Sequence, residues 1–459
     1  MNSISPHGLR QLAALLPAGE LRLDEIARAE HAGDKWFARH LPDAVVIPRS
    51  TQSVASLLRW ANRRGIPVTA RGGGQGYVGG CVPVRGGILL SLARLNRIRE
   101  ISTTDFVAVV QSGVITQHLQ EEVERLGLYY PPDPASRAEC SIGGNIATNA
   151  GGPRCLKYGV TRDYILGLEV VLADGTVVRL GSRTHKNKTG FDLARLFVGS
   201  EGMLGVVTEA TLRLLPRPAA RACALAGFAT MPQAARAIRA IFGAGLLPCA
   251  LEIADAFTLR AARKRTGNAL LEGCRALLIV ELDGQPASVR AELRTVERLL
   301  RKHNPLRRAR AWGDREVERL WRLRREFSYA LRDTGLTKLN QDVTVPRGRL
   351  EDLFAFTARL QGRHDFPVAC FGHAGDGNIH VNVMIDPGQP KVRLRSRRLL
   401  DELFDQVLRW GGVITGEHGI GLARKPWWPR ATTPEVRLLH RRIRFALDPH
   451  RILNPGKFL

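Results

Sequence analysis

The sequence predicts an α+β protein of two or three domains with a helical C-terminal segment. Three observations support this class: the 459-residue length, short β-rich runs set between glycine-dense loops over residues 42–218, and strands alternating with long amphipathic helices over residues 219–400. Residues 1–41 are expected to form a helical N-terminal segment, and residues 401–459 are mainly helical in pattern. A composition of 44% apolar and 24% charged residues is typical of a globular protein.

The region before residue 218 is predicted to be rich in strands because its apolar runs are short and end at turn residues. Examples are PDAVVIP, GILLSL and FVAVVQSG, and the Asp174-Gly175 pair predicts a tight hairpin within LGLEVVLADGTVVRL. The segment PRPAARA at 216–222 marks a boundary. Beyond it, ALLIVELDG, FPVACFG and NIHVNVMI alternate with helices such as SVRAELRTVERLLRKH, which predicts an α+β domain with one antiparallel sheet.

Charge and cysteine content exclude several functional classes. The net charge of +25 suits nucleic acid, an anionic membrane surface or acidic partners, but the arginines are dispersed along helices without an aromatic-interleaved stripe, so no nucleic-acid binding is expected. Attachment to the inner membrane or to a partner subunit stays open. The seven cysteines form no C-x-x-C pair, so neither an iron–sulfur cluster nor a zinc ribbon is expected, and their odd number favours reduced thiols. No apolar run approaches the roughly 18 residues of a membrane span, and the opening lacks a signal-peptide pattern, so the expected location is cytoplasmic.

The segment RGGGQGYVGG at 71–80 matches the G-x-G-x-x-G pattern but fails the structural test of a Rossmann turn. In a Rossmann turn a helix begins at once, so that the pyrophosphate rests on its N-terminus. Here Pro83 and the pair Gly86 and Gly87 forbid a helix, and a strand follows. Six glycines in ten residues still let backbone N–H groups cradle an anion. A second glycine-dense stretch, SIGGNIATNAGG at 141–152, allows a flat cofactor to lie against backbone.

The order of these segments resembles the PCMH-type FAD-binding domain of the vanillyl-alcohol-oxidase-like flavoproteins. The segments that carry the resemblance are PDAVVIP, RGGGQGYVGG, PPDPASRAECSIGGNIATNAGG and GSEGMLGVVTE. Three further motifs, GHAGDGNIHVN at 372–382, GEHGIG at 416–421 and LDPHRILNPGK at 447–457, resemble the branch that holds the glycolate oxidase catalytic subunit, D-lactate dehydrogenase and D-2-hydroxyglutarate dehydrogenase. The resemblance covers residues 42–459.

The resemblance implies noncovalent FAD, because Gln75 stands where relatives with covalently attached flavin carry histidine. The FAD pyrophosphate is expected on Arg71, Gly72, Gly73, Gly74, Gln75, Gly76, Tyr77, Gly79 and Gly80. The isoalloxazine and ribityl chain are expected along Ser141, Gly143, Gly144, Asn145, Ala147, Asn149, Ala150 and Gly151, with Pro132 and Asp133 just before them. The adenine end is expected near Gly202 and Val206 or Val207.

Two histidines and a carboxylate form a candidate metal site. His373 and His380 flank a glycine-bearing turn and can converge on one point, and Glu417 would add an oxygen ligand, a set suited to Zn, Mn or Fe(II). Spacing alone does not separate this reading from packed or surface histidines. The resemblance implies that the metal holds the hydroxyl and carboxylate of the substrate. It also implies that His418 acts as general base during hydride transfer to flavin N5, or that it hydrogen-bonds the reduced flavin.

A 2-hydroxy acid needs its carboxylate neutralised, which arginine does best through two parallel hydrogen bonds. By its register in the motif, Arg324 matches the substrate-clamping arginine of the family, with Ser328 one turn later. Asn382 matches another contact of the substrate or metal environment. Asn340 stands where several relatives carry lysine, with Lys338 two residues earlier, and this departure weakens 2-hydroxyglutarate as the expected substrate.

Together these features predict an FAD- and metal-dependent dehydrogenase that oxidises D-lactate, glycolate or a related D-2-hydroxy acid to the 2-oxo acid. The expected electron acceptor is a quinone, a cytochrome or an electron-transfer protein. Two other classes stay open: a metallohydrolase, in which the histidines and Glu417 activate water, and a noncatalytic or electron-transfer FAD-binding subunit of a glycolate-oxidase-like complex, which Asn340 keeps open. An aryl-alcohol oxidase or ether-lipid synthase of the same superfamily is disfavoured by the intact GEHG motif.

Overall fold

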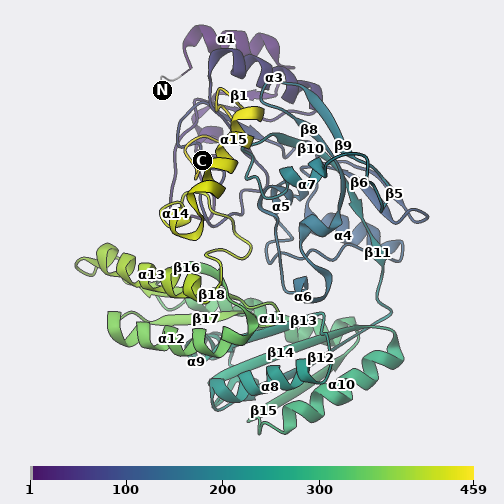
Figure 1. Ribbon diagram of the computed structural model, residues 1–459, viewed down its shortest axis with the longest axis vertical. Coiled ribbons are helices and arrows are strands. Elements are labelled where there is room, and N and C mark those ends of the chain that lie inside the picture. The colour runs from purple at the N-terminus through teal and green to yellow at the C-terminus, as the bar shows by residue number, and fades with distance from the viewer. Residues whose placement is uncertain (1–3) are drawn as a thin grey trace. The chain divides into compact units, whose positions relative to one another are not determined.

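The structure is a computed structural model that describes residues 4–459. These residues fall into two compact units (Figure 1). The first unit comprises residues 4–151, 160–217 and 417–459, and the second comprises residues 152–159 and 218–416. The chain therefore leaves the first unit and returns to it, and the returning section begins at Glu417, inside the GEHGIG motif.

Three sheets organise the first unit. A four-stranded sheet has the order β1-β2-β4-β3, with parallel pairing of β4 to both β2 and β3. An antiparallel five-stranded sheet has the order β5-β6-β10-β8-β9, and β11 pairs with β7. The strands are β1 (Leu21–Arg22), β2 (Ala44–Val46), β3 (Val68–Arg71), β4 (Ile88–Ser91), β5 (Ile98–Ser102), β6 (Val107–Gln111), β7 (Leu128–Tyr129), β8 (Ile165–Val171), β9 (Val177–Gly181), β10 (Val206–Arg213) and β11 (Leu215–Pro216). The tight hairpin expected at Asp174-Gly175 is confirmed by the β8–β9 pairing and by φ of +83° at Gly175.

The helices of the first unit are mostly short. They are α1 (Pro6–Leu15), α2 (Glu25–Glu30), α3 (Thr51–Arg64), α4 (Thr116–Arg125), α5 (Ile142–Thr148), α7 (Leu193–Phe197), α14 (Trp428–Ala431) and α15 (Pro434–Leu447), with a 3₁₀ turn at Thr161–Tyr164. α3 packs its apolar face on the four-stranded sheet, and Ile452 and Leu453 join the same hydrophobic core. Leu453 also forms a parallel bridge with Val68. The end of the chain is therefore built into the core that lies behind the glycine-rich loop.

The stretch at 141–152 differs from the glycine-dense loop expected from the sequence, because Ile142–Thr148 is helical. The Ser141 side chain caps this helix by accepting the N–H of Gly144 at 3.3 Å, and Asn149 ends it with a left-handed φ of +52°. A good cap at each end offsets the low helix propensity of the two glycines. From β3 to β4, by contrast, the chain forms no helix, as Pro83 and the following glycines predict.

One antiparallel seven-stranded sheet forms the centre of the second unit, as predicted. Its order is β15-β12-β14-β13-β17-β18-β16. The strands are β12 (Ala220–Phe228), β13 (Ala250–Asp255), β14 (Ala276–Gly284), β15 (Arg307–Trp312), β16 (Thr337–Thr344), β17 (Val368–His373) and β18 (Asn378–Ile385). The central strands are buried along almost their whole length, which requires cover on both faces.

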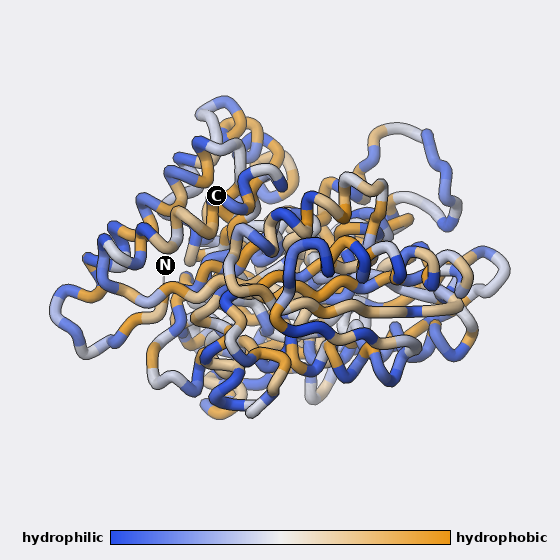
Figure 2. Tube along the Cα trace, turned by 90° about the horizontal axis from the view of Figure 1, so that it is seen from below, coloured by the Kyte–Doolittle hydropathy of each residue, from blue (hydrophilic) through white to orange (hydrophobic). Residues whose placement is uncertain are grey.

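Helices supply that cover on both faces of the sheet (Figure 1). α9 (Ala256–Thr266) and α11 (Asp314–Arg332) pack on one face, where Leu225, Ile279 and Phe371 lie in the hydrophobic core. The other face carries α8 (Met231–Gly243), α10 (Pro286–Arg301), α12 (Leu350–His364) and α13 (Val392–Arg409). Figure 2 shows hydropathy along the chain: extended stretches near the centre of the view carry much of the hydrophobic colour, while coiled stretches alternate between hydrophobic and hydrophilic residues.

Within residues 4–459, no helix combines the length and the apolar character that crossing a bilayer requires. All seven cysteines are free thiols, as their odd number suggested. Burial raises the pKa of the Cys223 and Cys249 thiols above the ordinary cysteine value, so these two behave as small apolar core residues.

Candidate active site

Two glycine-rich segments of the first unit lie against each other at backbone distance. A Cβ on Gly73 would stand 2.3 Å from the carbonyl oxygen of Glu139, and a Cβ on Gly72 would stand 2.5 Å from Oγ of Ser141. Cβ atoms do not approach other atoms this closely, so glycine is needed at both positions. The loop at 71–80, predicted to hold the pyrophosphate, is thus packed on the start of the second predicted FAD segment.

Gly80 and Gly144 are glycines that the packing of the protein itself does not require. Neither has a positive φ. A Cβ on Gly80 would meet only Val78 at 3.8 Å, and a Cβ on Gly144 would meet only Ser141 at 3.4 Å, which are ordinary contacts. Bare backbone at these positions suits a flat ligand that lies directly against the main chain. The residues present therefore fit FAD.

We expect Gly144→Val to weaken FAD binding by about tenfold or more, because its methyl groups would fill space beside the backbone where the cofactor is expected. The measurement is FAD affinity by fluorescence titration of the apoprotein, with circular dichroism to check folding. Gly362→Val is the matched control, since Gly362 is an exposed residue of α12 and a Cβ added there would meet nothing within 4 Å. Equal FAD affinity for Gly144→Val and the control would contradict the placement of FAD.

Arg71 anchors the glycine-rich loop from the end of β3. Its Nη1 donates a hydrogen bond to the carbonyl oxygen of Gly33 and lies 3.4 Å from Sγ of Cys81. Gln75 Nε2 donates to the carbonyl oxygen of Gly73 at 3.2 Å. Both side chains thus fix the shape of the loop, and contact with the pyrophosphate remains a prediction for each.

A buried glutamate fixes the GEHGIG loop within the first unit. Glu201 accepts the backbone N–H of Ile420 on Oε1 at 2.7 Å and that of Gly421 on Oε2 at 2.9 Å. Burial raises the pKa of Glu201 above its ordinary value, while the two N–H donors act to lower it. Asn454 Nδ2 donates to the carbonyl oxygens of Glu201 and Gly80, so the C-terminal segment ties this loop to the glycine-rich loop.

His418, the predicted base, lies beside the predicted FAD loop. Its ring centroid is 5.4 Å from that of Tyr77, and its Nε2 is 3.7 Å from Oε1 of Glu417. His418, Glu417 and Tyr77 all belong to the first unit. The structure therefore brings the candidate base together with one wall of the expected cofactor site.

In the second unit, strand register gathers polar side chains on one face of the sheet. Glu252 is paired with His373, and His380 is paired with Asp342. Because side chains alternate along a strand, residues two apart share a face. The polar side chains on this face include Glu252, His373, Asn378, His380, Asn382, Lys338, Asn340 and Asp342. It is the face that α11 covers, and α11 carries Arg324 and Ser328.

Glu252 links Arg324, which is predicted to bind the substrate carboxylate, to His373, a predicted metal ligand. Its Oε2 accepts Nε–H of Arg324 at 2.6 Å, and its Oε1 lies 2.6 Å from Nδ1 of His373. The carboxylate is fully buried, and burial acts to raise its pKa, but the charges of His373 and Arg324 outweigh burial and lower the pKa of Glu252 below its ordinary value. Arg324 also stacks on Phe371 at 4.7 Å, so its position is fixed on two sides.

The charged group near Ser328 is the ammonium of Lys338, whereas Asn340 is uncharged. Lys338 Nζ donates to Oγ of Ser328 at 2.7 Å. Burial, followed by the charge of Arg332, lowers the pKa of Lys338 to about 8. Asn340 is paired with Asn382 one step along the same face. A cation is thus present on this face, two residues from Asn340.

Asp342 holds the chain just before Glu417. Its Oδ2 accepts the hydroxyl of Thr415 at 2.9 Å and the backbone N–H of Gly416 at 3.0 Å, and its Oδ1 accepts Nδ2 of Asn378 at 2.7 Å. Asp342 is completely buried. Since Glu417 follows Gly416 directly, this carboxylate sets the path of the chain that enters the GEHGIG motif.

The histidines of the second unit fit a metal site. The ring centroids of His373 and His380 are 5.6 Å apart. A carboxylate on Nδ1 of His373 is the usual partner of a metal-bound imidazole, because it fixes the tautomer that offers Nε2 to the metal. Asp342 and His380 belong to a group of residues whose ligand atoms lie within 4.8 Å of one another. His373 is not in that group, so its role as a metal ligand remains a prediction. Nitrogen and oxygen donors of this kind suit Zn, Mn or Fe(II).

The sequence did not single out Glu252, Asp342 or Glu201 as site residues. Glu252 sits inside the apolar strand ALEIAD, and a charge in such a strand is the signal that could have found it, since buried carboxylates need partners. Glu201 precedes Gly202 in a predicted adenine segment, and nothing local to it indicates contact with residues 420–421.

A second group of charges is centred on Glu281, which lies on the same face of the sheet as Glu252 and on the neighbouring strand. Glu281 on β14 accepts hydrogen bonds from Arg154, Arg221 and Trp321. Burial acts to raise its pKa, and the arginine charges outweigh this and lower it. Both oxygens of the Glu281 carboxylate thus accept hydrogen bonds from protein side chains, which is typical of a structural network.

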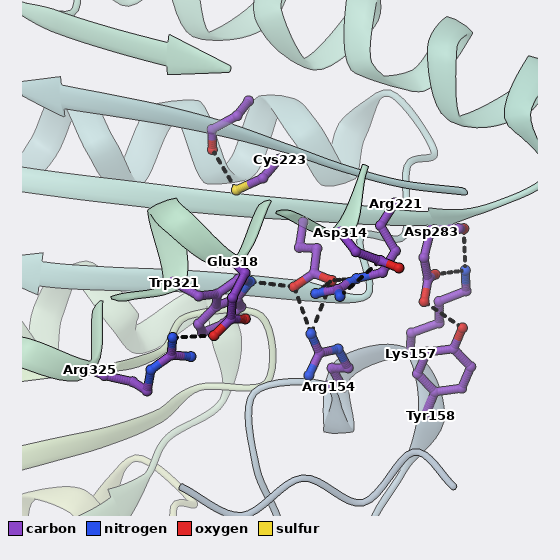
Figure 3. Close-up of polar contacts among 12 residues, drawn as sticks. Arg154, Lys157, Tyr158, Arg221, Cys223, Asp283, Asp314, Glu318, Trp321 and Arg325 are labelled. Atoms are coloured by element: carbon purple, nitrogen blue, oxygen red, sulfur yellow. Dashed lines mark hydrogen bonds and ion pairs between the residues drawn. The ribbon is translucent and has the colours of Figure 1, made fainter. Parts of the chain in front are cut away.

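The segment 152–159 is held to the second unit by further contacts. Asp283 accepts hydrogen bonds from Lys157 at 2.5 Å and from the Tyr158 hydroxyl at 2.7 Å (Figure 3). Leu156 packs on Gly375, where a Cβ would come within 2.3 Å of it. Gly375 lies in the turn that separates the two candidate metal histidines, so this segment supports the turn.

Comparison with known families agrees with this arrangement. Residues 42–181 match the family described as FAD binding domain, and residues 217–458 match the family described as FAD linked oxidases, C-terminal domain. The chain belongs to the FAD-linked oxidases. It is therefore a flavoprotein oxidoreductase, and the resemblance drawn from the glycine-rich loops and the GHAGDGNIH and GEHG motifs is confirmed.

Similar proteins include the glycolate oxidase subunit GlcD of Bacillus subtilis, 37% identical over 91% of this chain and 89% of that protein. The D-lactate dehydrogenase of Anaerostipes hadrus is 31% identical over 99% of this chain and 98% of its own. The D-2-hydroxyglutarate dehydrogenase of Xanthomonas citri pv. viticola is 36% identical over 97% of this chain and 95% of its own. Among solved structures, p-cresol methylhydroxylase matches with a TM-score of 0.80 at 18% identity over 99% of this chain and 97% of its own, a likeness of fold alone.

Proposed function

We propose that this FAD-linked oxidase oxidises a small 2-hydroxy acid, namely D-lactate, glycolate or a related D-2-hydroxy acid, to the 2-oxo acid. The observation that carries the proposal is the buried Glu252, which joins a guanidinium to a candidate metal histidine on one face of the sheet. An arginine that binds a carboxylate, held next to a metal ligand, suits a substrate whose carboxylate and hydroxyl lie on adjacent carbons. The names of the three relatives support the same substrate class.

The residues of the chain have distinct roles in this proposal. Arg324, held by Glu252 through Nε, offers its remaining N–H groups to the substrate carboxylate. His373, His380 and Glu417 would hold a divalent metal, whose chemistry is to lower the pKa of the substrate hydroxyl. His418 takes the hydroxyl proton as general base. FAD, when bound, supplies the acceptor for the hydride that leaves Cα. The natural electron acceptor is a quinone, a cytochrome or an electron-transfer protein.

Asp342 is proposed to position Glu417 rather than to take part in the chemistry. We expect Asp342→Asn to weaken metal retention by about 10- to 100-fold, because an amide cannot accept all three hydrogen bonds that the carboxylate receives. The measurement is the metal-to-protein ratio after dialysis against graded chelator. Asp283→Asn, in the network of Lys157 and Tyr158, is the control, and equal metal retention in the two variants would contradict this role.

The tail of the substrate is expected to be sensed by Lys338. Protonated Lys338 would attract an acidic tail. This attraction is nearly complete at pH 7, is halved near the Lys338 pKa of about 8, and is lost as the pH rises further. We therefore expect KM for D-2-hydroxyglutarate to rise about tenfold between pH 7 and pH 9.5 relative to KM for D-lactate. Lys338→Met should show the high KM at both pH values. A wild-type KM ratio that does not change with pH would contradict the assignment.

The proposed reaction is tested by steady-state rates with an artificial electron acceptor on the metal-replete holoenzyme. Glycolate, D-lactate, L-lactate and D-2-hydroxyglutarate are compared. The proposal predicts turnover of glycolate or of a D-acid, with kcat/KM for D-lactate about 100-fold or more above that for L-lactate if lactate is a substrate. Equal rates with both lactates, or no turnover of any of the four acids, would contradict it.

A further inference from the structure

The helix α15 turns apolar side chains toward solvent. It is 14 residues long, and Arg444 is its one buried side chain. Phe445 is 60% exposed, Leu439 56% and Leu438 41%. A helix of this length in a folded domain normally packs an apolar stripe against the core, so the outward placement of these residues needs a reason.

Polar contacts fix which side of α15 faces inward. Arg444 donates to the carbonyl oxygens of Leu453 at 2.7 Å and Leu459 at 3.0 Å. The ring of His440 packs edge-on against Trp428 at 5.8 Å. All of these partners belong to the first unit. The contacts fix the rotation of α15 about its own axis, so that Leu438, Leu439 and Phe445 stay exposed.

Arginines share the exposed arc with the apolar residues. At about 100° per residue, Arg441 and Arg442 lie on either side of the line through Leu438 and Phe445. Neither arginine has a carboxylate partner within residues 4–459. Glu435 is the one acidic residue of the helix, and it lies in the first turn. The outer surface of α15 is thus apolar and cationic at once, in a chain of net charge +25.

We propose that α15 docks on an anionic phospholipid surface. Leu438, Leu439 and Phe445 would enter the boundary between headgroups and acyl chains, and Arg441 and Arg442 would contact lipid phosphates. Apolar and basic residues interleaved on one exposed helix fit such an interface, where the two kinds of environment lie within a few ångströms of each other. Docking of this kind does not depend on which 2-hydroxy acid the enzyme oxidises.

Two other occupants fit the surface less well. A two-fold contact with a second copy would bring two sets of Arg441 and Arg442 into one interface, with only the two Glu435 side chains to offset them. A hydrophobic groove of a partner protein would call for a continuous apolar stripe, and here Arg442 lies between Phe445 and Leu439 around the helix.

The test is sedimentation of the FAD-bound full chain with vesicles of phosphatidylcholine alone or with 30% phosphatidylglycerol added. We expect binding to the anionic vesicles only. The double variant Arg441→Gln/Arg442→Gln should bind about tenfold more weakly or worse, and Leu438→Ser/Phe445→Ser should lose binding to a similar extent. The matched control is Arg294→Gln/Arg298→Gln, which removes two exposed arginines from α10 and leaves α15 intact.

Three outcomes would overturn the proposal. The first is no binding of the wild-type chain to either kind of vesicle, as expected if an acidic protein is the partner. The second is equal loss of binding in the α15 variants and the α10 control, which would assign binding to overall charge. The third is wild-type binding by both α15 variants. Circular dichroism and flavin absorbance of each variant, compared with wild type, verify that folding and FAD content are intact.

Discussion

Replacing Glu252 by glutamine is expected to lower kcat/KM about 100-fold, because the amide cannot hold Arg324 and His373 together. The free energy of unfolding should also fall by about 3 kcal/mol, since the half-buried guanidinium of Arg324 loses its counter-charge. Steady-state kinetics and urea denaturation measure the two effects. Both kcat and KM should change, because the substrate clamp and the metal ligand are disturbed at once.

Glu281→Gln is the matched control for Glu252→Gln. Glu281 is equally buried in the same sheet, and its partners are Arg154, Arg221 and Trp321, whereas Glu252 is bonded to a candidate metal histidine. We expect Glu281→Gln to lower the free energy of unfolding by a similar amount while leaving kcat/KM within about fivefold of wild type. Equal losses of kcat/KM in the two variants would mean that Glu252 acts only through stability.

Replacing His418 by glutamine is expected to slow flavin reduction by about 10³-fold, because the proposed general base is lost. FAD affinity should stay near the wild-type value, since the expected cofactor cradle is formed by glycine-rich backbone elsewhere in the first unit. The measurement is single-turnover reduction of bound flavin, followed by absorbance after rapid mixing with substrate under anaerobic conditions.

The alternative role of His418, a hydrogen bond to reduced flavin, gives a different result. In that case the midpoint potential of the flavin should shift while the reduction rate falls less than tenfold. His440→Gln serves as control, because His440 is an exposed histidine of the same C-terminal section. A reduction rate for His418→Gln that matches this control would contradict the assignment of His418 as base.

Several features could be read from the sequence because their causes are local. Pro83 and the glycines after it forbid a helix, so the glycine-rich loop could be separated from a Rossmann turn without a structure. The Asp174-Gly175 pair specifies a hairpin for the same kind of reason. The antiparallel sheet of the second unit could also be predicted from the sequence, because strands and amphipathic helices alternate there with clear periodicity.

The polar network of the site could not be read in this way because it depends on strand register. Glu252 and His373 are 121 residues apart in sequence and meet because β13 pairs with β17. Periodicity predicts that each strand is buried but not which strand lies beside it. The helix at Ile142–Thr148 was missed for a different reason: capping by Ser141 and Asn149 outweighed the glycines that favour a loop.

The most direct test of the central claim is the visible spectrum of the purified, metal-replete protein under anaerobic conditions, before and after adding glycolate, D-lactate, L-lactate and D-2-hydroxyglutarate in turn. We expect a flavin band that glycolate or a D-acid bleaches within a turnover and that L-lactate leaves unchanged. A bound flavin that none of these acids reduces would contradict the proposed reaction. A colourless protein that takes up no FAD would contradict the assignment of the glycine-rich segments as its cofactor site.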